Sequence, residues 1–174
     1  FTQYSRKKAR KRIKQPYEES DFVIGLVGSL KSYHMVEELI RATKRLEPDI
    51  HLLILGDGPD RESLERLVGD LDLENKVIFT GFVEHDRVDE YIAACDVMYG
   101  AINPDHFGNA IKCYEYLASG RPIITDDRSE FKFVEAIDAG ITIDHVTIDE
   151  VAAAIRRLRS MSRQERLEMG ARGR

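Results

Sequence analysis

The feature that most constrains the fold is a regular alternation of short apolar segments with amphipathic ones. The apolar segments are predicted to be strands, and they span residues 21–28, 50–55, 76–80, 97–99, 123–124 and 139–143. Helical spacing predicts helices over residues 36–46, 61–68, 86–95, 148–158 and 163–169, and around Glu115. Short strands that alternate with helices predict a parallel sheet covered by helices on both faces. We therefore expect an α/β, doubly wound, Rossmann-like fold.

Glycine-bearing turns follow several of the predicted strands. Gly28 ends the first strand, Gly56 and Gly58 follow the second, Gly81 follows the third, and Gly108 comes after the fourth. The carboxyl ends of parallel strands meet at one edge of the sheet, and ligands of such folds bind there. The turns therefore predict a ligand site at this edge.

The segment 103–125 predicts what kind of ligand binds. Its helix places Lys112 and Glu115 three residues apart, on one helical face. Free N–H groups at the helix start and a fixed cation suit phosphate oxygens, and a carboxylate can accept hydrogen bonds from two ribose hydroxyls. We expect a nucleotide, with an ordinary surface ion pair as the alternative interpretation. No Gly-x-Gly-x-x-Gly follows the first strand, which argues against a nicotinamide dinucleotide.

The charges exclude some classes of function. The chain has 33% charged residues and a net charge of -5, which predicts a globular protein without general affinity for nucleic acid. The run 6–14 is densely basic, and we interpret it as a solvated arm or helix face, with attraction to anionic lipid as the alternative. Cys95 and Cys113 fit no metal spacing and are predicted to be buried free thiols, so we expect a reducing cytoplasm. The sequence shows neither a signal peptide nor an apolar run long enough to span a membrane.

Four motifs of the chain resemble those of a known enzyme family. They are Gly28-Ser29-Leu30-Lys31-Ser32-Tyr33-His34, Leu55-Gly56-Asp57-Gly58-Pro59, Gly81-Phe82-Val83 and Lys112-x-x-Glu115-Tyr116-x-Ala118-x-Gly120-x-Pro122. They resemble the C-terminal, donor-binding half of a GT-B-fold retaining glycosyltransferase of family 4 (group 1), and the resemblance covers residues 22–170. Much of that family has a glutamate eight positions before Glu115, where it contacts the transferred sugar. This chain has Phe107 at that position.

The resemblance implies roles for individual residues. Those expected at the donor diphosphate are Gly28, Ser29, Lys31, His34, Gly108, Asn109, Ala110, Ile111 and Lys112. Glu115 is expected at the ribose, and the main chain around Phe82 and Val83 at the edge of the base. The resemblance also implies retaining chemistry with neither a metal nor a cofactor, the nucleotide sugar being a substrate.

The resemblance also predicts how the chain is organised. Residues 1–20 are expected to be a basic linker from a preceding domain that binds the acceptor, and residues 21–174 the nucleotide-sugar domain, with a truncated C-terminal crossover helix. The remaining catalytic groups would lie in the preceding half, so this chain alone should not transfer a sugar. We expect a cytoplasmic protein, peripheral to the inner membrane face if the basic run or a lipid-linked acceptor meets a membrane.

Two other function classes remain open at this stage. A nucleotide-sugar epimerase of the same architecture would bind a similar ligand, and a non-catalytic domain that binds nucleotide or phosphate is the second alternative. A receiver-like domain would need a phospho-accepting aspartate at the end of the third strand, where this chain has Thr80 and Gly81. Two interpretations remain open for His34, His85 and His106: each either lies beside the ligand or contacts no ligand. His51 and His145 are interpreted as structural.

Overall fold

The protein contains a six-stranded sheet in which every strand pair is parallel. The computed structural model describes residues 5–13, 15–103, 105–106 and 111–174, and the order of the strands is β3-β2-β1-β4-β5-β6. The strands are β1 (Phe22–Val27), β2 (Ile50–Leu55), β3 (Val77–Gly81), β4 (Val97–Tyr99), β5 (Ile123–Asp126) and β6 (Gly140–Ile143). The predicted fold class is confirmed.

The sheet is buried on both faces because apolar residues occupy both sides of each central strand. Successive strand residues point to opposite faces, so in β1 the side chains of Phe22, Ile24 and Leu26 join one apolar cluster and Val23 joins the other. In β4, Val97 and Tyr99 belong to the first cluster and Met98 to the second. This burial explains the continuous apolar runs of the sequence, which would be alternating in a sheet with one wet face.

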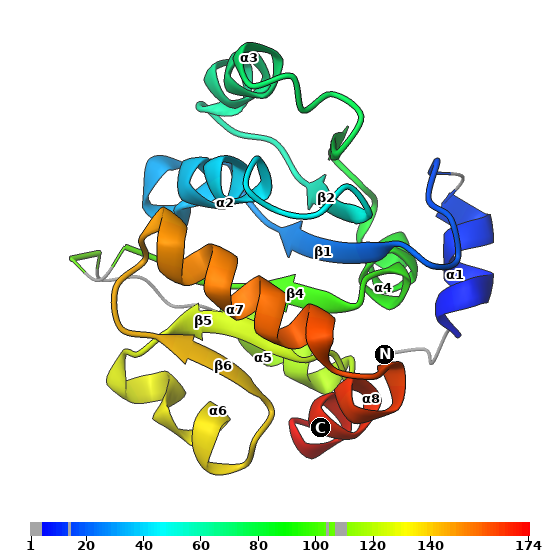
Figure 1. Cartoon of the computed structure of the whole chain (residues 1–174), viewed down its shortest axis with the longest axis vertical. Helices are drawn as coiled ribbons and strands as arrows, with labels where there is room; N and C mark the ends of the chain where they lie inside the picture. The colour runs from blue at the N-terminus through cyan, green and yellow to red at the C-terminus, as the bar shows by residue number, and fades with distance from the viewer. Residues whose placement is uncertain (1–4, 14, 104, 107–110) are drawn as a thin grey trace.

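Helices cover both faces of the sheet (Figure 1). They are α1 (Arg6–Ile13), α2 (Val36–Thr43), α3 (Arg61–Asp70), α4 (His85–Ala94), α5 (Ile111–Ala118), α6 (Lys132–Ala136), α7 (Ile148–Ser160) and α8 (Arg163–Arg172), with short 3-10 helices η1 (Ser32–His34) and η2 (Ser129–Phe131). Residues of α2, α3 and α7 line the first apolar cluster, and residues of α1, α4 and α5 line the second. In the described part of the chain, none of the helices has the length and apolar character needed to cross a bilayer.

Two helices show clear differences from the prediction. α2 ends at Thr43, and the buried Leu46 lies beyond it in the turn that leads to β2. The short helix α6 was not predicted, because five residues are too few to establish a helical period in a sequence. The two thiols agree with the prediction, since Cys95 and Cys113 are both buried and free.

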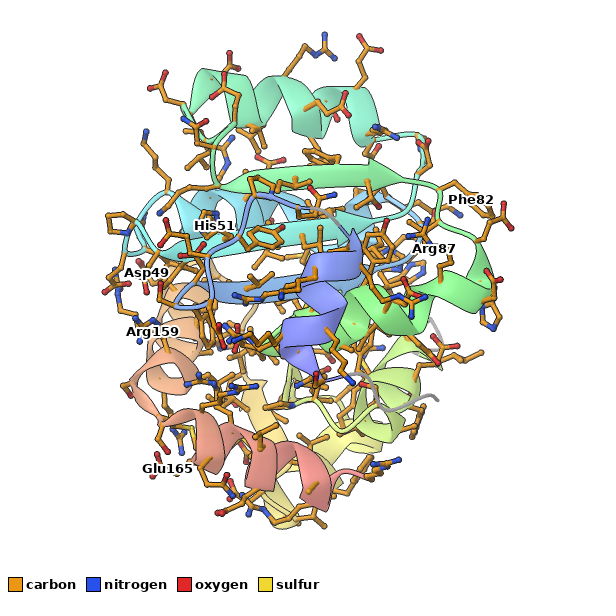
Figure 2. All side chains as sticks on the ribbon, turned by 90° about the vertical axis from the view of Figure 1, so that its right-hand side faces the viewer. Asp49, His51, Phe82, Arg87, Arg159 and Glu165 are labelled. Atoms are coloured by element: carbon orange, nitrogen blue, oxygen red, sulfur yellow. The ribbon has the colours of Figure 1, made fainter. Side chains whose placement is uncertain are left out.

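The basic segment near the N-terminus requires a correction. It forms α1, the helix nearest the viewer in Figure 2, and the side chains of Arg6 and Arg10 are only 8% and 7% exposed. Both guanidinium groups donate to Oδ2 of Asp96, at 3.2 and 2.9 Å. The expectation of a solvated run is therefore wrong for these two arginines, because a buried carboxylate needs charged partners. It holds for Lys7 and Lys11, which are exposed.

The order of the strands reverses between β1 and β4. From β1 the chain proceeds to β2 and β3 on one side, and from β4 to β5 and β6 on the other. Connections at such a switch point leave on opposite faces of the sheet, which opens a crevice beyond the carboxyl ends of the two central strands. Gly28 directly follows β1 and Gly100 directly follows β4, so both lie at this crevice.

Candidate nucleotide-binding site

The floor of the crevice consists of backbone from three glycine turns. The N–H of Gly28 donates to the carbonyl oxygen of Leu55 at 2.9 Å, and the N–H of Gly56 donates to that of Gly81 at 2.9 Å. The φ angles of Gly28, Gly56 and Gly81 are 141°, 131° and 69°, which residues with a side chain rarely adopt. A Cβ on Gly56 would also lie 2.0 Å from the carbonyl oxygen of Gly28. The predicted gathering of these turns at one edge of the sheet is confirmed.

A cleft of about 340 Å³ opens above this floor. It is lined by Val27, Gly28, Ser29, Leu55, Gly56, Asp57, Phe82, Val83 and Val88. The cleft therefore brings two residues predicted at the diphosphate, Gly28 and Ser29, together with the two predicted at the base. Phe82 follows β3 and is 77% exposed, and Figure 2 shows it at the edge of the molecule.

Helix α5 is fixed to the end of β1 by a tyrosine that the sequence analysis did not assign. The hydroxyl of Tyr116 accepts a hydrogen bond from the N–H of Val27 at 2.8 Å and donates one to its carbonyl oxygen at 3.0 Å. On the same helix the thiol of Cys113 donates to the carbonyl oxygen of Gly100 at 3.6 Å. A Cβ on Gly100 would lie 2.3 Å from Sγ of Cys113, so a glycine is needed where α5 crosses the end of β4.

Lys112 lies one helical turn before Tyr116 and extends over the end of β1. Its Cδ is 4.0 Å from the position that a Cβ on Gly28 would take. Its Nζ is enclosed by protein and has no hydrogen-bond partner among the described residues. Burial lowers the pKa of Lys112 from 10.5 to about 8, although nearby Cys113 and Asp126 act in the opposite direction.

Glu115 lies on the same helix and is half-buried. No ion pair joins it to Lys112 in the described part of the chain. The alternative interpretation of these two residues as an ordinary surface ion pair is therefore wrong, because the lysine is directed at the glycine floor. Ile111, the first residue of α5, is exposed, whereas Gly108, Asn109, Ala110 and Phe107 lie outside the described residues.

The rings of Tyr33, His34 and His106 lie close together, and His34 is near enough to Lys112 for the lysine charge to act on it. Nδ1 of His34 hydrogen-bonds to the carbonyl oxygen of Ser29, and burial, followed by the nearby charge of Lys112, lowers the pKa of His34 to about 4. The ring of Tyr33 stacks on that of His106, with centroids 3.8 Å apart and planes 10° apart. Nζ of Lys31 lies 5.8 Å from the centre of the Tyr33 ring. The structure thus brings His34, His106 and Lys31 into one cluster with Lys112.

The remaining histidines lie elsewhere. His51 belongs to β2, and its Nε2 is 3.4 Å from Oδ2 of Asp21, which precedes β1, so this pair lies near the amino ends of the strands. His145 is exposed after β6, and His85 is an exposed residue at the start of α4. None of these three lines the cleft next to Phe82.

Comparison with known proteins identifies the family. A model of the family described as "Glycosyl transferases group 1" matches residues 7–174. The chain belongs to this family. The fold matches that of GT-B glycosyltransferase structures, which agrees with the family resemblance of the sequence motifs.

Curated relatives include other glycosyltransferases. The chain is 32% identical over 151 residues to the lipopolysaccharide core biosynthesis glycosyltransferase LpsD of Rhizobium meliloti, covering 86% of this chain and 43% of LpsD. It is 29% identical over 154 residues to the alpha-D-kanosaminyltransferase of Streptomyces kanamyceticus, covering 86% of this chain and 39% of that enzyme. The chain therefore spans less than half the length of these relatives.

Solved structures of other proteins have the same fold. The C-terminal domain of LpcC from Francisella tularensis superposes with a TM-score of 0.82 at 20% identity, covering 99% of this chain and 91% of that one. Anabaena HepE in complex with UDP and glucose superposes with a TM-score of 0.78 at 21% identity, covering 97% of this chain and 45% of HepE. At these identities the likeness establishes the fold, and ligands of the relatives bear on this chain only as a proposal.

Proposed function

We propose that this chain is the donor-binding half of a glycosyltransferase that moves a sugar from a nucleoside diphosphate to an acceptor. The observation that carries the proposal is the Nζ of Lys112, enclosed and without a partner among the described residues, beside Gly28 at the switch point of the sheet. A buried ammonium group without a partner is unfavourable in the free protein. An anion bound over Gly28 and Ser29 would supply the missing partner.

The chemistry of the reaction explains why a cation belongs at this position. When the glycosidic bond of a nucleotide sugar breaks, negative charge grows on the diphosphate that leaves. Groups already fixed in place stabilise this charge without reorganising. Lys112 is such a group, because Tyr116 holds α5 to the backbone of Val27. Peptide N–H groups at the start of α5, from residues 108–111, are proposed as further donors to the diphosphate.

The rest of the nucleotide would extend from Lys112 toward Phe82. The cleft between Ser29 and Val83 offers room and an apolar lining for a base, with the exposed Phe82 ring at its rim. Glu115 lies one turn from Lys112 and is proposed to accept hydrogen bonds from the ribose hydroxyls. HepE has been solved with UDP and with UDP-glucose, which supports a nucleotide sugar as the ligand class.

Several finer points of the proposal rest on the family resemblance. We propose retaining chemistry of the family 4 type without a metal or cofactor, and an acceptor-binding domain that precedes this one and supplies the other wall of the active site. LpsD is a glycosyltransferase of lipopolysaccharide core biosynthesis, which supports glycan biosynthesis as the role of this protein. We further propose a cytoplasmic enzyme that works on a lipid-linked acceptor at an anionic membrane. The chain alone should bind a donor without transferring its sugar, because transfer needs both partners held in reactive geometry.

A thermal-protection assay tests the proposal directly. We expect UDP or GDP to raise the melting temperature of the protein and the matching nucleoside to have a much smaller effect, because the diphosphate meets Lys112. Chemical-shift mapping should then place the bound diphosphate near Gly28, Gly81 and Glu115. Protection by none of a full panel of nucleoside diphosphates, or shifts confined to the amino ends of the strands, would refute the proposed function.

A further inference from the structure

The hydrogen bond of His34 fixes the tautomer of its ring. Nδ1 lies at hydrogen-bond distance from the carbonyl oxygen of Ser29. A carbonyl oxygen can only accept a hydrogen bond, so Nδ1 carries the proton of the neutral ring and Nε2 keeps its lone pair. In this state His34 can offer a ligand an acceptor at Nε2 but no positive charge.

The surroundings of His34 keep its ring neutral. Lys112 approaches from α5, His106 from the segment after β4, and Lys31 from the residue before η1, and each of them disfavours a proton on His34. Burial has the largest effect, and burial and these charges together outweigh the hydrogen bond to Ser29, so the pKa of His34 falls to about 4. The groups with the largest effect on His34 include no carboxylate, and residues 107–110 bring no titratable side chain to this cluster.

A bound diphosphate would reverse this balance. Its negative charges would lie against Lys112, whose charge acts on His34, and against Ser29, which accepts the hydrogen bond from the His34 ring. These charges would oppose the repulsion between a protonated His34 and the neighbouring cations. A nearby opposite charge favours the charged form of an imidazole. The free Nε2 is the position at which the ring can accept a proton, and the resulting imidazolium would keep donating to Ser29 through Nδ1.

The geometry points to a specific role for His34, which rests on the proposed function of the site. We propose that His34 takes up one proton from the solvent at Nε2 when the diphosphate of a nucleotide sugar binds, and so becomes a second cation beside Lys112. A new N–H bond forms on Nε2, and no other covalent bond changes. The charge of the site would thus increase only when the donor is present, and the proton would return to solvent when the nucleotide leaves.

Proton uptake makes affinity depend on pH in a defined direction. Because the pKa of His34 would be higher in the complex than its value of about 4 in the free protein, proton uptake accompanies binding between these two pKa values. Across that range the affinity should fall by up to about tenfold per pH unit as the pH rises, as expected for one linked proton, and it should level off above the pKa reached in the complex. Lys112 contributes little to the proton uptake near pH 7, because with a pKa of about 8 it is already mostly charged in the free protein.

Calorimetry in buffers of different ionisation enthalpy measures the linked proton. We would titrate the protein at pH 7.0 with UDP-glucose and with GDP-mannose, in PIPES, MOPS and imidazole, avoiding phosphate because it would compete for the site. The diphosphate of a nucleotide sugar has no group that titrates near pH 7, so any proton taken up belongs to the protein. The dependence of the binding heat on the buffer should correspond to about one proton per bound ligand.

Matched variants assign the proton to His34. Asn in His34→Asn can place an amide near the position of Nδ1 and donate to Ser29, but it cannot titrate, so its binding heat should not depend on the buffer. The exposed His145→Asn is the control and should behave as wild type. Uptake that persists in His34→Asn, or that disappears in His106→Asn but not in His34→Asn, would overturn the assignment.

The wild-type protein supplies an independent readout if His34→Asn fails to fold. The imidazole ¹⁵N shifts of His34 should report the Nδ1–H tautomer in the free protein and a doubly protonated ring in the complex. Binding without any dependence on the buffer would refute the proton uptake and leave the proposed function intact. Absence of binding heat with these two and with nucleotide sugars of the other bases would refute the proposed function, and this inference with it.

Discussion

Replacing Lys112 with methionine should make the free protein more stable while it weakens the binding of nucleotides. The Nζ of Lys112 is enclosed without a hydrogen-bond partner among the described residues, so the free protein carries the cost of a desolvated charge. Methionine has a similar length and no charge, and it should fill the same space over Gly28.

The size of the stability effect follows from the pKa of Lys112. Burial lowers it from 10.5 to about 8 in the folded protein. Below pH 8 the lysine is charged in the folded and unfolded states alike, and the difference between the two pKa values corresponds to roughly 3 kcal/mol of unfolding free energy. Since the side chain is half-buried as a whole, we expect a gain of about 1 to 3 kcal/mol for Lys112→Met at pH 7. For a chain of this size that is an increase of about 3 to 10 °C in melting temperature.

The pH dependence of stability provides a second test of whether Lys112→Met stabilises the free protein. Because the folded-state pKa is lower than the unfolded one, wild type regains stability as pH rises from 8 to 10.5, where the folded state holds a neutral lysine. The advantage of Lys112→Met should therefore shrink across this range and vanish above pH 10.5. Thermal melts from pH 6 to 10.5 measure this, with Lys132→Met as the control, since Lys132 is an exposed lysine on α6.

Lys112→Met should weaken nucleotide binding, although it stabilises the free protein. Loss of a charge-assisted hydrogen bond weakens nucleoside diphosphate binding by about 1.5 to 3 kcal/mol, or roughly 10- to 150-fold in Kd. The uncharged nucleoside should bind almost as it does to wild type. A Lys112→Met protein less stable than wild type at pH 7, or one that loses affinity for nucleoside and diphosphate equally, would refute this account of Lys112.

Three further predictions concern other parts of the molecule. In a direct binding titration, Glu115→Gln should weaken the binding of ribonucleotides more than that of 2′-deoxyribonucleotides. Equal losses of affinity would show that Glu115 does not bind the ribose. Phe82→Ala should weaken nucleotides by about 0.5 to 1.5 kcal/mol, as for a lost aromatic stack, and leave inorganic diphosphate unaffected; weaker binding of both would point to a disturbed glycine floor. Asp96→Asn should lower the unfolding free energy in urea by about 3 to 5 kcal/mol, because it leaves Arg6 and Arg10 buried without their counter-charge, and a loss no larger than that of the exposed Asp138→Asn would contradict this.

The strands could be predicted closely because burial on both faces leaves a local signal. Ile50–Leu55 and Val97–Tyr99 have the bounds expected from their apolar runs. The burial of Arg6 and Arg10 could not be predicted, because their partner Asp96 lies 90 and 86 residues away in the sequence. A run of basic residues is usually solvated, and only the fold brings this one to a buried carboxylate.

The candidate site was predictable in part for a similar reason. Glycines after strands are visible in a sequence, so the floor at Gly28, Gly56 and Gly81 could be anticipated. Lys112 and Glu115 were also predicted, from their spacing on one helix. The positions of Tyr116 and of the Tyr33–His106 stack depend on contacts between distant segments, since Tyr116 reaches Val27 across 89 residues. An apolar helix face gives no sign that one of its tyrosines will hydrogen-bond to a strand end.

The glycine floor has a consequence for protein engineering. Its shape is maintained by main-chain hydrogen bonds among Gly28, Leu55, Gly56 and Gly81, and the hydroxyl of Thr80 adds one to the carbonyl oxygen of Gly81 at 3.0 Å. Residues at the rim, such as Phe82, can therefore be varied in a library without altering the surface on which a phosphate would rest. A library restricted to the rim, with the floor and Tyr116 left intact, should yield folded variants that differ in the donor they accept.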